Sequence, residues 1–259
     1  MKRIFITGSS DGLGMMASNL LIEQGHKVVL HAKNPSRAED ALKANPNAEA
    51  VTVADLSSIS ETISLAEQVN KLGHFDAIIH NAGIGFNENR KNKTEDGLPY
   101  VFAVNSLAPY ILTSLIHRPQ RLIYTSSVLH RNGDSSLEDL LWDHRTWNGY
   151  QAYADSKFHN VLLAFSVANL WKNIYSNALE PGWVATKLGG KNAPDSIVDA
   201  PLTQIWLATS DEAQVLQSGN YYYHKKNKSV HQDARNTDIQ NNFIEQCAKI
   251  SGVKFPFDF

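Results

Sequence analysis

The chain has a single cysteine, Cys247, among its 259 residues, so an intrachain disulfide is excluded. No apolar stretch approaches the roughly 18 residues needed to span a bilayer, and the apolar run that starts at Ile4 leaves no room for a signal peptide. A formal net charge of −2 gives no reason to expect nucleic acid or an anionic membrane as partner. We therefore expect a cytoplasmic protein.

Metal-ligand patterns and linker-like segments are absent as well. None of the ten histidines stands at a metal-ligand spacing with Glu or Cys, so no metal is expected. No repeat or low-complexity tract divides the chain, and a composition of 42% apolar and 19% charged residues is typical of a globular protein. At this length one sheet with helices on both faces is the economical arrangement, so we expect a single domain over residues 1–259.

Short apolar runs alternate with segments of helical periodicity along the chain. Strands are predicted at 3–7, 27–31, 49–53, 75–80, 121–127, 176–182 and 218–224. Helices are expected after each of the first three strands, with a long one over about 96–115 and another over 151–171. This alternation predicts an α/β protein with a doubly wound, seven-stranded, mainly parallel sheet of the Rossmann type and helices on both faces.

A glycine-rich turn, TGSSDGLG (7–14), lies between the first predicted strand and the first predicted helix. The unpaired N–H groups of a helix N-terminus attract anions, and Gly8, Gly12 and Gly14 let the backbone approach a pyrophosphate without Cβ clashes. The spacing is GxxxGxG rather than GxGxxG, and glycine turns also join strands to helices in many proteins. Its place after the first strand favours a dinucleotide site.

The end of the second predicted strand bears on which dinucleotide is bound. An acidic residue there would accept a hydrogen bond from the ribose 2′-OH and favour NAD. Ala32 stands there instead, followed by Lys33, whose cation can neutralise a 2′-phosphate and so favours NADP over NAD. Ser10 and Arg37 can add contacts. The alternative is that Lys33 is only a surface lysine.

Tyr153 precedes Lys157 by four residues in a predicted helix, so both lie on one face. Tyr221 and Tyr222 also precede lysines by four, but in a predicted strand such residues are roughly 13 Å apart. A nearby ammonium and an oxidised nicotinamide favour the phenolate form of a tyrosine. Tyr153 could then exchange a proton with a carbonyl or alcohol oxygen, and Ser127 could hydrogen-bond the same oxygen.

Taken in order, several segments resemble the single-domain branch of the short-chain dehydrogenase/reductase family over essentially the whole chain. They are TGSSDGLG (7–14), ADL (54–56), HNAG (80–83), VNSLAPYILT (104–113), YTSS (124–127), YADSK (153–157) and EPGWVAT (180–186). TEDG (94–97) and the wide gap between Ser127 and Tyr153 look like the retinol-dehydrogenase and WW-domain-oxidoreductase group. The membrane anchors and WW modules of that group are absent from this sequence, so retinoid or membrane work is not carried over.

The resemblance implies hydride transfer between NADP(H) and a small carbonyl or alcohol substrate. It assigns catalysis to Ser127, Tyr153, Lys157 and Asn105, the last supporting a water-linked proton path to Lys157. It also implies that Asp55 reaches the adenine amino group and that Val184 and Thr186 position the nicotinamide. The full cofactor set that it implies is Gly8, Ser10, Asp11, Gly12, Leu13, Gly14, Lys33, Asp55, Leu56, Asn81, Ala82, Gly83, Tyr153, Lys157, Pro181, Gly182, Val184 and Thr186.

The polar segment 128–150 is expected to hang over the pocket as an active-site insertion. Its apolar and aromatic residues, together with Trp183, suggest an apolar or aromatic carbonyl compound; they are His130, Leu140, Leu141, Trp142, Trp147 and Tyr150. The alternative, that the tryptophans only pack the loop down, stays open. His130 is interpreted as a loop histidine rather than a catalytic one.

Two broader expectations complete the interpretation. The helix at 151–171 is apolar on two sides, so one side can face the sheet and the other a second subunit, which predicts a homodimer or homotetramer. The alternative function is a catalytically idle regulator that uses the same fold to sense NADP. The combination of Ser127, Tyr153 and Lys157 argues against it, because a sensor does not need all three.

Overall fold

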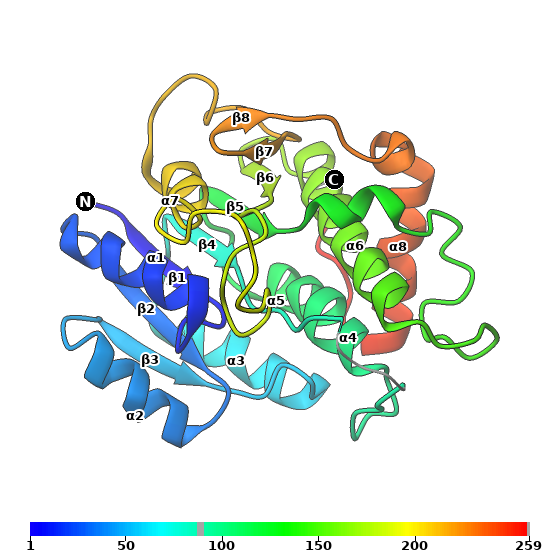
Figure 1. The fold of residues 1–259 in the computed structure, drawn as a ribbon, viewed down its shortest axis with the longest axis horizontal. Coiled ribbons are helices and arrows are strands. Elements are labelled where there is room, and N and C mark those ends of the chain that lie inside the picture. The colour runs from blue at the N-terminus through cyan, green and yellow to red at the C-terminus, as the bar shows by residue number, and fades with distance from the viewer. Residues whose placement is uncertain (87–90, 258–259) are drawn as a thin grey trace.

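A computed structural model describes residues 1–86 and 91–257 of the chain (Figure 1). The described residues form one eight-stranded sheet in the order β3-β2-β1-β4-β5-β6-β7-β8. All neighbouring strands are parallel except β7 and β8. The strands are β1 (Arg3–Ile6), β2 (Lys27–Ala32), β3 (Ala50–Val53), β4 (Ala77–His80), β5 (Arg121–Thr125), β6 (Tyr175–Leu179), β7 (Tyr221–Tyr223) and β8 (Lys226–Asn227).

The seven predicted strands and the Rossmann-type arrangement are confirmed. β2 extends one residue beyond its predicted range, and the other six strands are shorter than predicted, with β6 also starting one residue earlier. The eighth strand was not predicted. It is a two-residue return of the chain after β7, across a turn in which His224 and Lys225 have positive φ angles of 48° and 60°. Its residues are exposed, so no apolar pattern marks it.

Helices cover both faces of this sheet (Figure 1). They are α1 (Gly12–Glu23), α2 (Pro35–Ala44), α3 (Ile59–Lys71), α4 (Tyr100–Phe102), α5 (Ala108–Leu115), α6 (Gly149–Leu170), α7 (Leu202–Thr209) and α8 (Thr237–Ser251). Side chains of α1, α2 and α7 pack with Ile4 and Ile6 on one face, and those of α3, α5, α6 and α8 pack with Phe5 on the other. Because alternate residues of β1 are buried on opposite faces, the strand reads as a continuous apolar run.

The long helix predicted over about 96–115 is wrong in its first part and interrupted in its middle. Helical structure starts only at α4, after Pro99, and a π-helical turn, Ala103–Leu107, separates α4 from α5. Pro109 has no backbone N–H, so it cannot supply the α-helical hydrogen bond to the carbonyl of Asn105. The π-helical turn accommodates this gap in the ladder, and π turns are frequent at functional sites.

The second apolar side of α6 is covered by the chain itself. Residues Ala152 to Val167 are all buried, and α8 packs along the helix with Phe243 stacked on His159 at 4.8 Å between ring centres. Beyond α8, the carbonyl of Pro256 accepts a hydrogen bond of 2.9 Å from the Trp171 indole. This side of α6 therefore gives no support to the expected second subunit, and the homo-oligomer stays a prediction.

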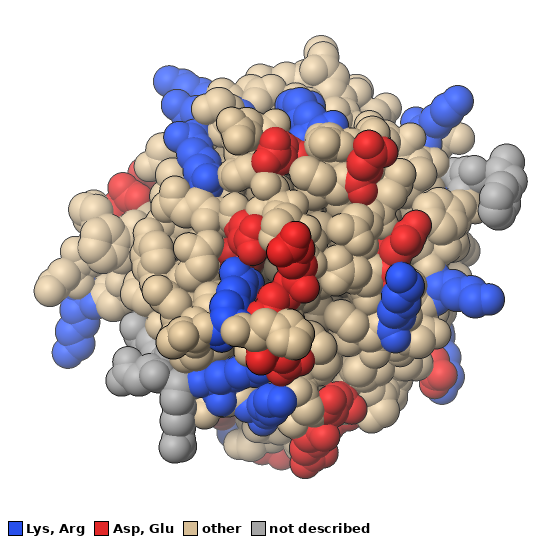
Figure 2. All heavy atoms as spheres, turned by 90° about the vertical axis from the view of Figure 1, so that its right-hand side faces the viewer, with Lys and Arg blue, Asp and Glu red and all other residues tan. Residues whose placement is uncertain are grey.

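The face of the molecule that contains α8 carries both signs of charge (Figure 2). Acidic side chains gather toward the middle of this view, with lysines and arginines interspersed around them. None of the helices in the described part of the chain has the length and apolar character to cross a membrane.

Candidate active site

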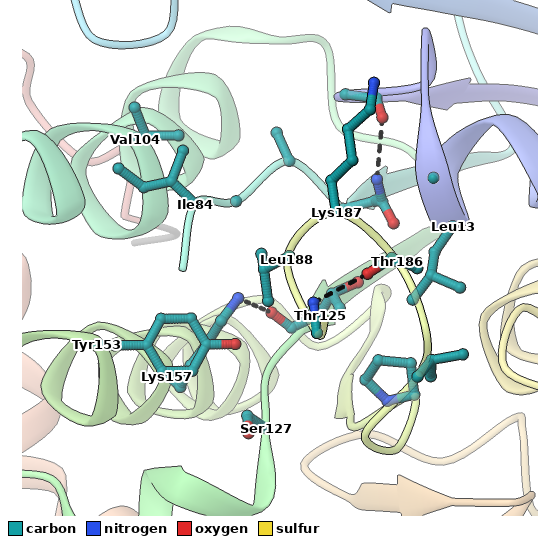
Figure 3. Close-up of a pocket in the computed structure, with 18 of the residues that line it drawn as sticks. Leu13, Ile84, Val104, Thr125, Ser127, Tyr153, Lys157, Thr186, Lys187 and Leu188 are labelled. Atoms are coloured by element: carbon teal, nitrogen blue, oxygen red, sulfur yellow. Dashed lines mark hydrogen bonds between the residues drawn. The ribbon is translucent and has the colours of Figure 1, made fainter. Parts of the chain in front are cut away.

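A cavity of about 800 Å³ opens along the carboxyl ends of the parallel strands. Its lining comes from the segments that follow β1, β2, β3, β4, β5 and β6, together with residues of α4 and α6. Successive strands are added to one side of β1 as far as β3 and then, from β4 onward, to its other side. Ligands of doubly wound folds bind beside the point where the strand order switches in this way. Figure 3 shows part of the cavity, with Tyr153 and Ser127 on one side and Leu13 and Lys187 on the other.

The glycine turn has the shape that a phosphate cradle needs. Gly8 has a φ angle of +63°, and a Cβ added there would lie 2.8 Å from the Cα of Ala82. A Cβ on Gly14 would lie only 2.4 Å from the carbonyl oxygen of Gly8. Asp11 caps α1 by accepting a hydrogen bond of 2.8 Å from the N–H of Gly12. The turn and the N-terminus of α1 therefore fit a pyrophosphate group.

Lys33 is paired in this structure. Its ammonium donates to the hydroxyl of Tyr100 at 2.5 Å and lies 3.0 Å from a carboxylate oxygen of Asp55. Burial acts to raise the pKa of Asp55, but hydrogen bonds from Ser57 and the neighbouring Lys33 hold that pKa below its ordinary value. The predicted cation and the predicted adenine-binding carboxylate are thus neighbours, and Tyr100, which sequence reasoning missed, stands beside both.

Three of the four predicted catalytic residues, Ser127, Tyr153 and Lys157, line the same cavity (Figure 3). Tyr153 and Lys157 are buried on α6, and the ammonium nitrogen of Lys157 lies 5.4 Å from the centre of the Tyr153 ring. That nitrogen donates a hydrogen bond of 3.1 Å to the carbonyl of Thr125. Ser127 follows β5, and its hydroxyl accepts from the N–H of Leu129 at 3.3 Å.

Burial dominates the protonation of this pair in the cofactor-free protein. It raises the pKa of Tyr153 to about 12, and the neighbouring Ser127 hydroxyl acts against the rise. Burial also lowers the pKa of Lys157 to about 8. The sequence argument expected the Lys157 ammonium and an oxidised nicotinamide together to lower the pKa of Tyr153. The chain by itself does not do so, because desolvation of the phenolate outweighs its polar neighbours.

Asn105 lies in the π-helical turn directly behind the cavity. Its side-chain oxygen accepts from the N–H of Ile84 at 2.8 Å, and its amide group donates to the carbonyl of Ile84 and to the Ser156 hydroxyl, both at 3.0 Å. A Cβ on Gly83 would lie 3.3 Å from the Lys157 nitrogen and 3.4 Å from the Asn105 oxygen. Asn105 and Lys157 therefore meet across Gly83.

The structure brings nearly all the predicted site residues together. The cavity lining contains Gly8, Ser10, Asp11, Gly12, Leu13, Lys33, Asp55, Leu56, Asn81, Ala82, Gly83, Ser127, Tyr153, Lys157, Pro181, Gly182, Val184 and Thr186. The two exceptions, Gly14 and Asn105, pack immediately behind this lining. Lining residues that the sequence argument did not assign include His31, Tyr100, Thr125, Glu180 and Lys187. The signal for His31 was a histidine in an otherwise apolar buried strand.

The segment 128–150 is held against α6. Arg145 pairs with Asp155 of α6 at 2.8 Å and with Asp134 at 3.2 Å, and its guanidinium lies 3.7 Å from the centre of the Trp142 ring. Trp142 and Trp147 pack on each other with ring centres 5.2 Å apart. This packing favours the alternative in which the tryptophans hold the loop down, and neither is among the described residues that line the cavity.

A different apolar group surrounds the catalytic end of the cavity. The Phe86 ring lies 5.7 Å from the Tyr153 ring and 5.9 Å from the Tyr150 ring. Trp183, 58% exposed, donates from its indole to the carbonyl of Gly189 at 2.7 Å. The large apolar lining residues at this end are Phe86, Val128, Leu129, Tyr150, Trp183 and Leu188.

His130 has a structural role, as the sequence argument expected. His130 is buried, contacts Tyr221 at 4.4 Å between ring centres, and donates from Nδ1 to the carbonyl of Ser127 at 2.7 Å. Within residues 1–86 and 91–257, no cluster of three or more His, Cys, Asp or Glu side chains could hold a metal ion.

The fold and this cavity define a dinucleotide-binding α/β protein with a Ser-Tyr-Lys constellation. A family model described as short chain dehydrogenase matches residues 2–133. The chain is 46% identical to an uncharacterized oxidoreductase of Emericella nidulans over 99% of both chains. It is 43% identical to a short-chain dehydrogenase of Penicillium rubens over 99% of this chain and 100% of that one. This chain therefore belongs to the short-chain dehydrogenase family, which is a family of oxidoreductases.

More distant similarities agree with this placement. Human retinol dehydrogenase 13 is 26% identical over 98% of this chain and 86% of the human chain. This confirms the resemblance to the retinol dehydrogenases. An uncharacterized protein of Mycobacterium paratuberculosis superposes with a TM-score of 0.85 at 22% identity, over 99% of this chain and 96% of that one. RhlG of Pseudomonas aeruginosa, solved as an NADP complex, has a TM-score of 0.66 at 20% identity, over 85% and 93% of the two chains. These structures support the fold.

Proposed function

We propose that the chain is an NADP-dependent oxidoreductase that transfers a hydride between the nicotinamide and a carbonyl or alcohol substrate. The observation that carries the proposal is the meeting of Ser127, Tyr153 and Lys157 at the catalytic end of a cavity whose other end is a glycine cradle. When bound, the cofactor supplies or accepts the hydride at the substrate carbon. The glycine turn, Lys33 and Thr186 are the residues that would hold it.

The chain's own residues handle the proton. In reduction the hydride forms the new C–H bond at the carbonyl carbon. The Tyr153 hydroxyl donates its proton to the carbonyl oxygen, which becomes the alcohol oxygen. The Ser127 hydroxyl donates a hydrogen bond to the same oxygen as negative charge develops on it. A protonated Lys157 beside the ring stabilises the phenolate left behind. Asn105 holds the Ile84 backbone next to Lys157 for the return of a proton.

NADP rather than NAD is supported by the second strand. No carboxylate follows β2 at the position that would accept the ribose 2′-OH, and Lys33 supplies a cation there. The 2′-phosphate would compete with Asp55 for this ammonium. The RhlG structure, related in fold, was solved with NADP.

The apolar lining supports a carbonyl group attached to a bulky apolar or aromatic group. Exposed large apolar side chains are costly in water and often mark ligand-binding surfaces. Phe86, Tyr150 and Trp183 are exposed in this way around one opening. A panel of ketones and aldehydes at matched reactivity should show kcat/KM rising with apolar size. Equal values for acetaldehyde and aryl ketones would contradict this substrate class.

The test of the proposed reaction is Tyr153→Phe, with Tyr150→Phe as a matched control one turn earlier on the same helix. We expect Tyr153→Phe to lower kcat by about 10³-fold or more while the Kd for NADPH stays within about threefold. The Tyr150 variant should keep its turnover. Normal turnover in Tyr153→Phe would sink the assigned role. The alternative, an NADP-sensing regulator, would show tight cofactor binding in the wild type without turnover of any carbonyl in the panel.

A further inference from the structure

His31 connects two parts of the cavity, at Gly8 and at Ala54, that are 46 residues apart in the chain. It lies in β2, is 3% exposed, and lines the cavity with its ring between the glycine turn and the segment after β3. Its Nδ1 accepts a hydrogen bond of 2.9 Å from the N–H of Gly8. Its Nε2 is 3.0 Å from the carbonyl oxygen of Ala54.

These two partners determine where the imidazole proton is. A backbone N–H can only donate and a carbonyl oxygen can only accept, so Nδ1 is the acceptor and Nε2 carries the hydrogen. The ring is therefore neutral. Burial lowers the pKa of His31 to about 4, which agrees with a neutral ring at physiological pH.

The backbone of His31 also holds the glycine turn. Its N–H donates to the hydroxyl of Ser9 at 2.8 Å, and its carbonyl accepts from the N–H of Ser9 at 3.1 Å. From the other side the amide of Asn81 donates to the carbonyl of Gly8 at 3.2 Å. Gly8 is thus held at both its N–H and its C=O in the left-handed conformation that the turn requires.

The second partner of the His31 ring, Ala54, lies at the end of the cavity that the adenosine of the cofactor would occupy. Ala54 precedes Asp55, the carboxylate that pairs with Lys33. The imidazole therefore links the peptide that shapes the phosphate cradle to the backbone that presents Asp55.

We propose that His31 is a positioning residue for the cofactor, whose neutral ring preorganises the glycine turn and the Ala54–Asp55 backbone before the dinucleotide binds. Without the Nδ1 acceptor, the half-buried Gly8 N–H loses its protein partner, and the turn is no longer held in its left-handed conformation from this side. That loss of order takes away binding free energy, because a site that is already ordered loses less entropy on binding. The inference rests on the proposed use of a dinucleotide cofactor.

Two substitutions each keep one of the two hydrogen-bonding groups of the imidazole. An asparagine amide oxygen can stand near the Nδ1 position and accept from Gly8, whereas a glutamine amide reaches the Nε2 position and can donate to Ala54. Leucine fills the space with neither group. The series His31→Asn, His31→Gln and His31→Leu therefore separates the acceptor, the donor and the volume.

The measurements are the Kd for NADPH by fluorescence titration and the Tm of the cofactor-free protein. We expect His31→Asn to stay within about threefold of the wild-type Kd, and His31→Gln to weaken binding by about tenfold. His31→Leu, where it folds, should weaken binding at least as much. His159→Leu is the control, because that histidine, on α6, is also buried but bonds to Ser106 of the π-helical turn, away from the glycine turn. It should lower Tm without changing Kd.

Lower Tm with unchanged Kd in all three His31 variants would overturn the proposal, since His31 would then be only a core residue. Equal weakening in the Asn and Gln variants would overturn the assignment of the effect to Gly8. Failure of the wild type to bind NADPH or NADH would instead refute the proposed function, so the two failures are distinguishable.

Discussion

The Lys157 ammonium lies 5.4 Å from the centre of the Tyr153 ring and is bound to the carbonyl of Thr125 at 3.1 Å. Both side chains are buried, and burial shifts each toward its uncharged form, with a pKa of about 12 for the phenol and about 8 for the amine. The helix thus carries a buried charge that costs stability and that the proposed reaction uses.

Lys157→Met should make the cofactor-free protein more stable while abolishing turnover. A fall in pKa from 10.5 to about 8 corresponds to roughly 3 kcal/mol. The loss of the hydrogen bond to Thr125 takes part of this away, so we expect a gain of roughly 1–3 kcal/mol at pH 7. Urea unfolding measures it, and a variant less stable than the wild type would contradict the prediction.

The same pair predicts a pH dependence. Because the folded pKa of Lys157 lies below its unfolded value, the unfolded chain holds the proton more tightly between pH 8 and 10.5. The cost of the buried ammonium is complete below pH 8 and is relieved as pH rises through this window. The stability difference between Lys157→Met and the wild type should therefore shrink from pH 7 to pH 9.5. A difference that stays constant would show that the ammonium is not desolvated.

Lys33→Ala should change which cofactor is used. Removing a charge-assisted contact to a 2′-phosphate should lower kcat/KM for NADPH by about 10- to 100-fold and leave that for NADH almost unchanged. Lys43→Ala, on the exposed part of α2, is the control. Equal losses with both cofactors would assign Lys33 to the general shape of the adenosine site through Tyr100 and Asp55.

Arg145→Met should destabilise the protein. It removes the partner of Asp155, a carboxylate whose side chain is 4% exposed, and breaking a buried ion pair costs about 3–5 kcal/mol. Asp155 can relieve part of that cost by taking up a proton, because burial already raises its pKa. We expect a loss of roughly 2–4 kcal/mol, and the double variant Arg145→Met/Asp155→Asn should recover part of it. An unchanged unfolding midpoint would show that segment 128–150 is not held by this pair.

Phe243→Ala tests whether α8 or a second subunit completes the packing of α6. Phe243 is fully buried and stacks on His159, so truncation should cost about 3–5 kcal/mol. An intrachain contact gives the same loss at every protein concentration, whereas an intersubunit contact makes Tm depend on concentration. Sedimentation of the wild type measures the predicted homo-oligomer directly, and only monomer at micromolar concentration would count against it.

The strands were predicted well because a strand that is buried on both faces of a sheet appears in the sequence as a continuous apolar run. β1, β2 and β5 have this character, and their ranges differ from the prediction by one or two residues. Two helices, α7 and α8, were missed. Only a narrow group of large apolar residues in α8 is buried, Phe243 and Ile244 among them, and nothing local says which surface they cover. The break at Asn105 is hard to predict because Pro109 is a single proline inside an otherwise apolar helical pattern.

The amino-acid sequence by itself determined the order of β1 to β7 and of the helices up to α6, the glycine turn, and the placing of Tyr153 and Lys157 on one helix face. These follow from local periodicity and local geometry, which neighbouring residues decide among themselves. The tertiary structure alone decided that His31 bonds to Gly8, that Lys33 meets Tyr100 67 residues away, and that Trp142 packs on Arg145 rather than over the cavity. The first two contacts join residues 23 and 67 positions apart, and only the register of the sheet and the packing of helices on it bring them within hydrogen-bonding distance. The place of Trp142 depends on how segment 128–150 packs against α6 through Arg145 and Asp155.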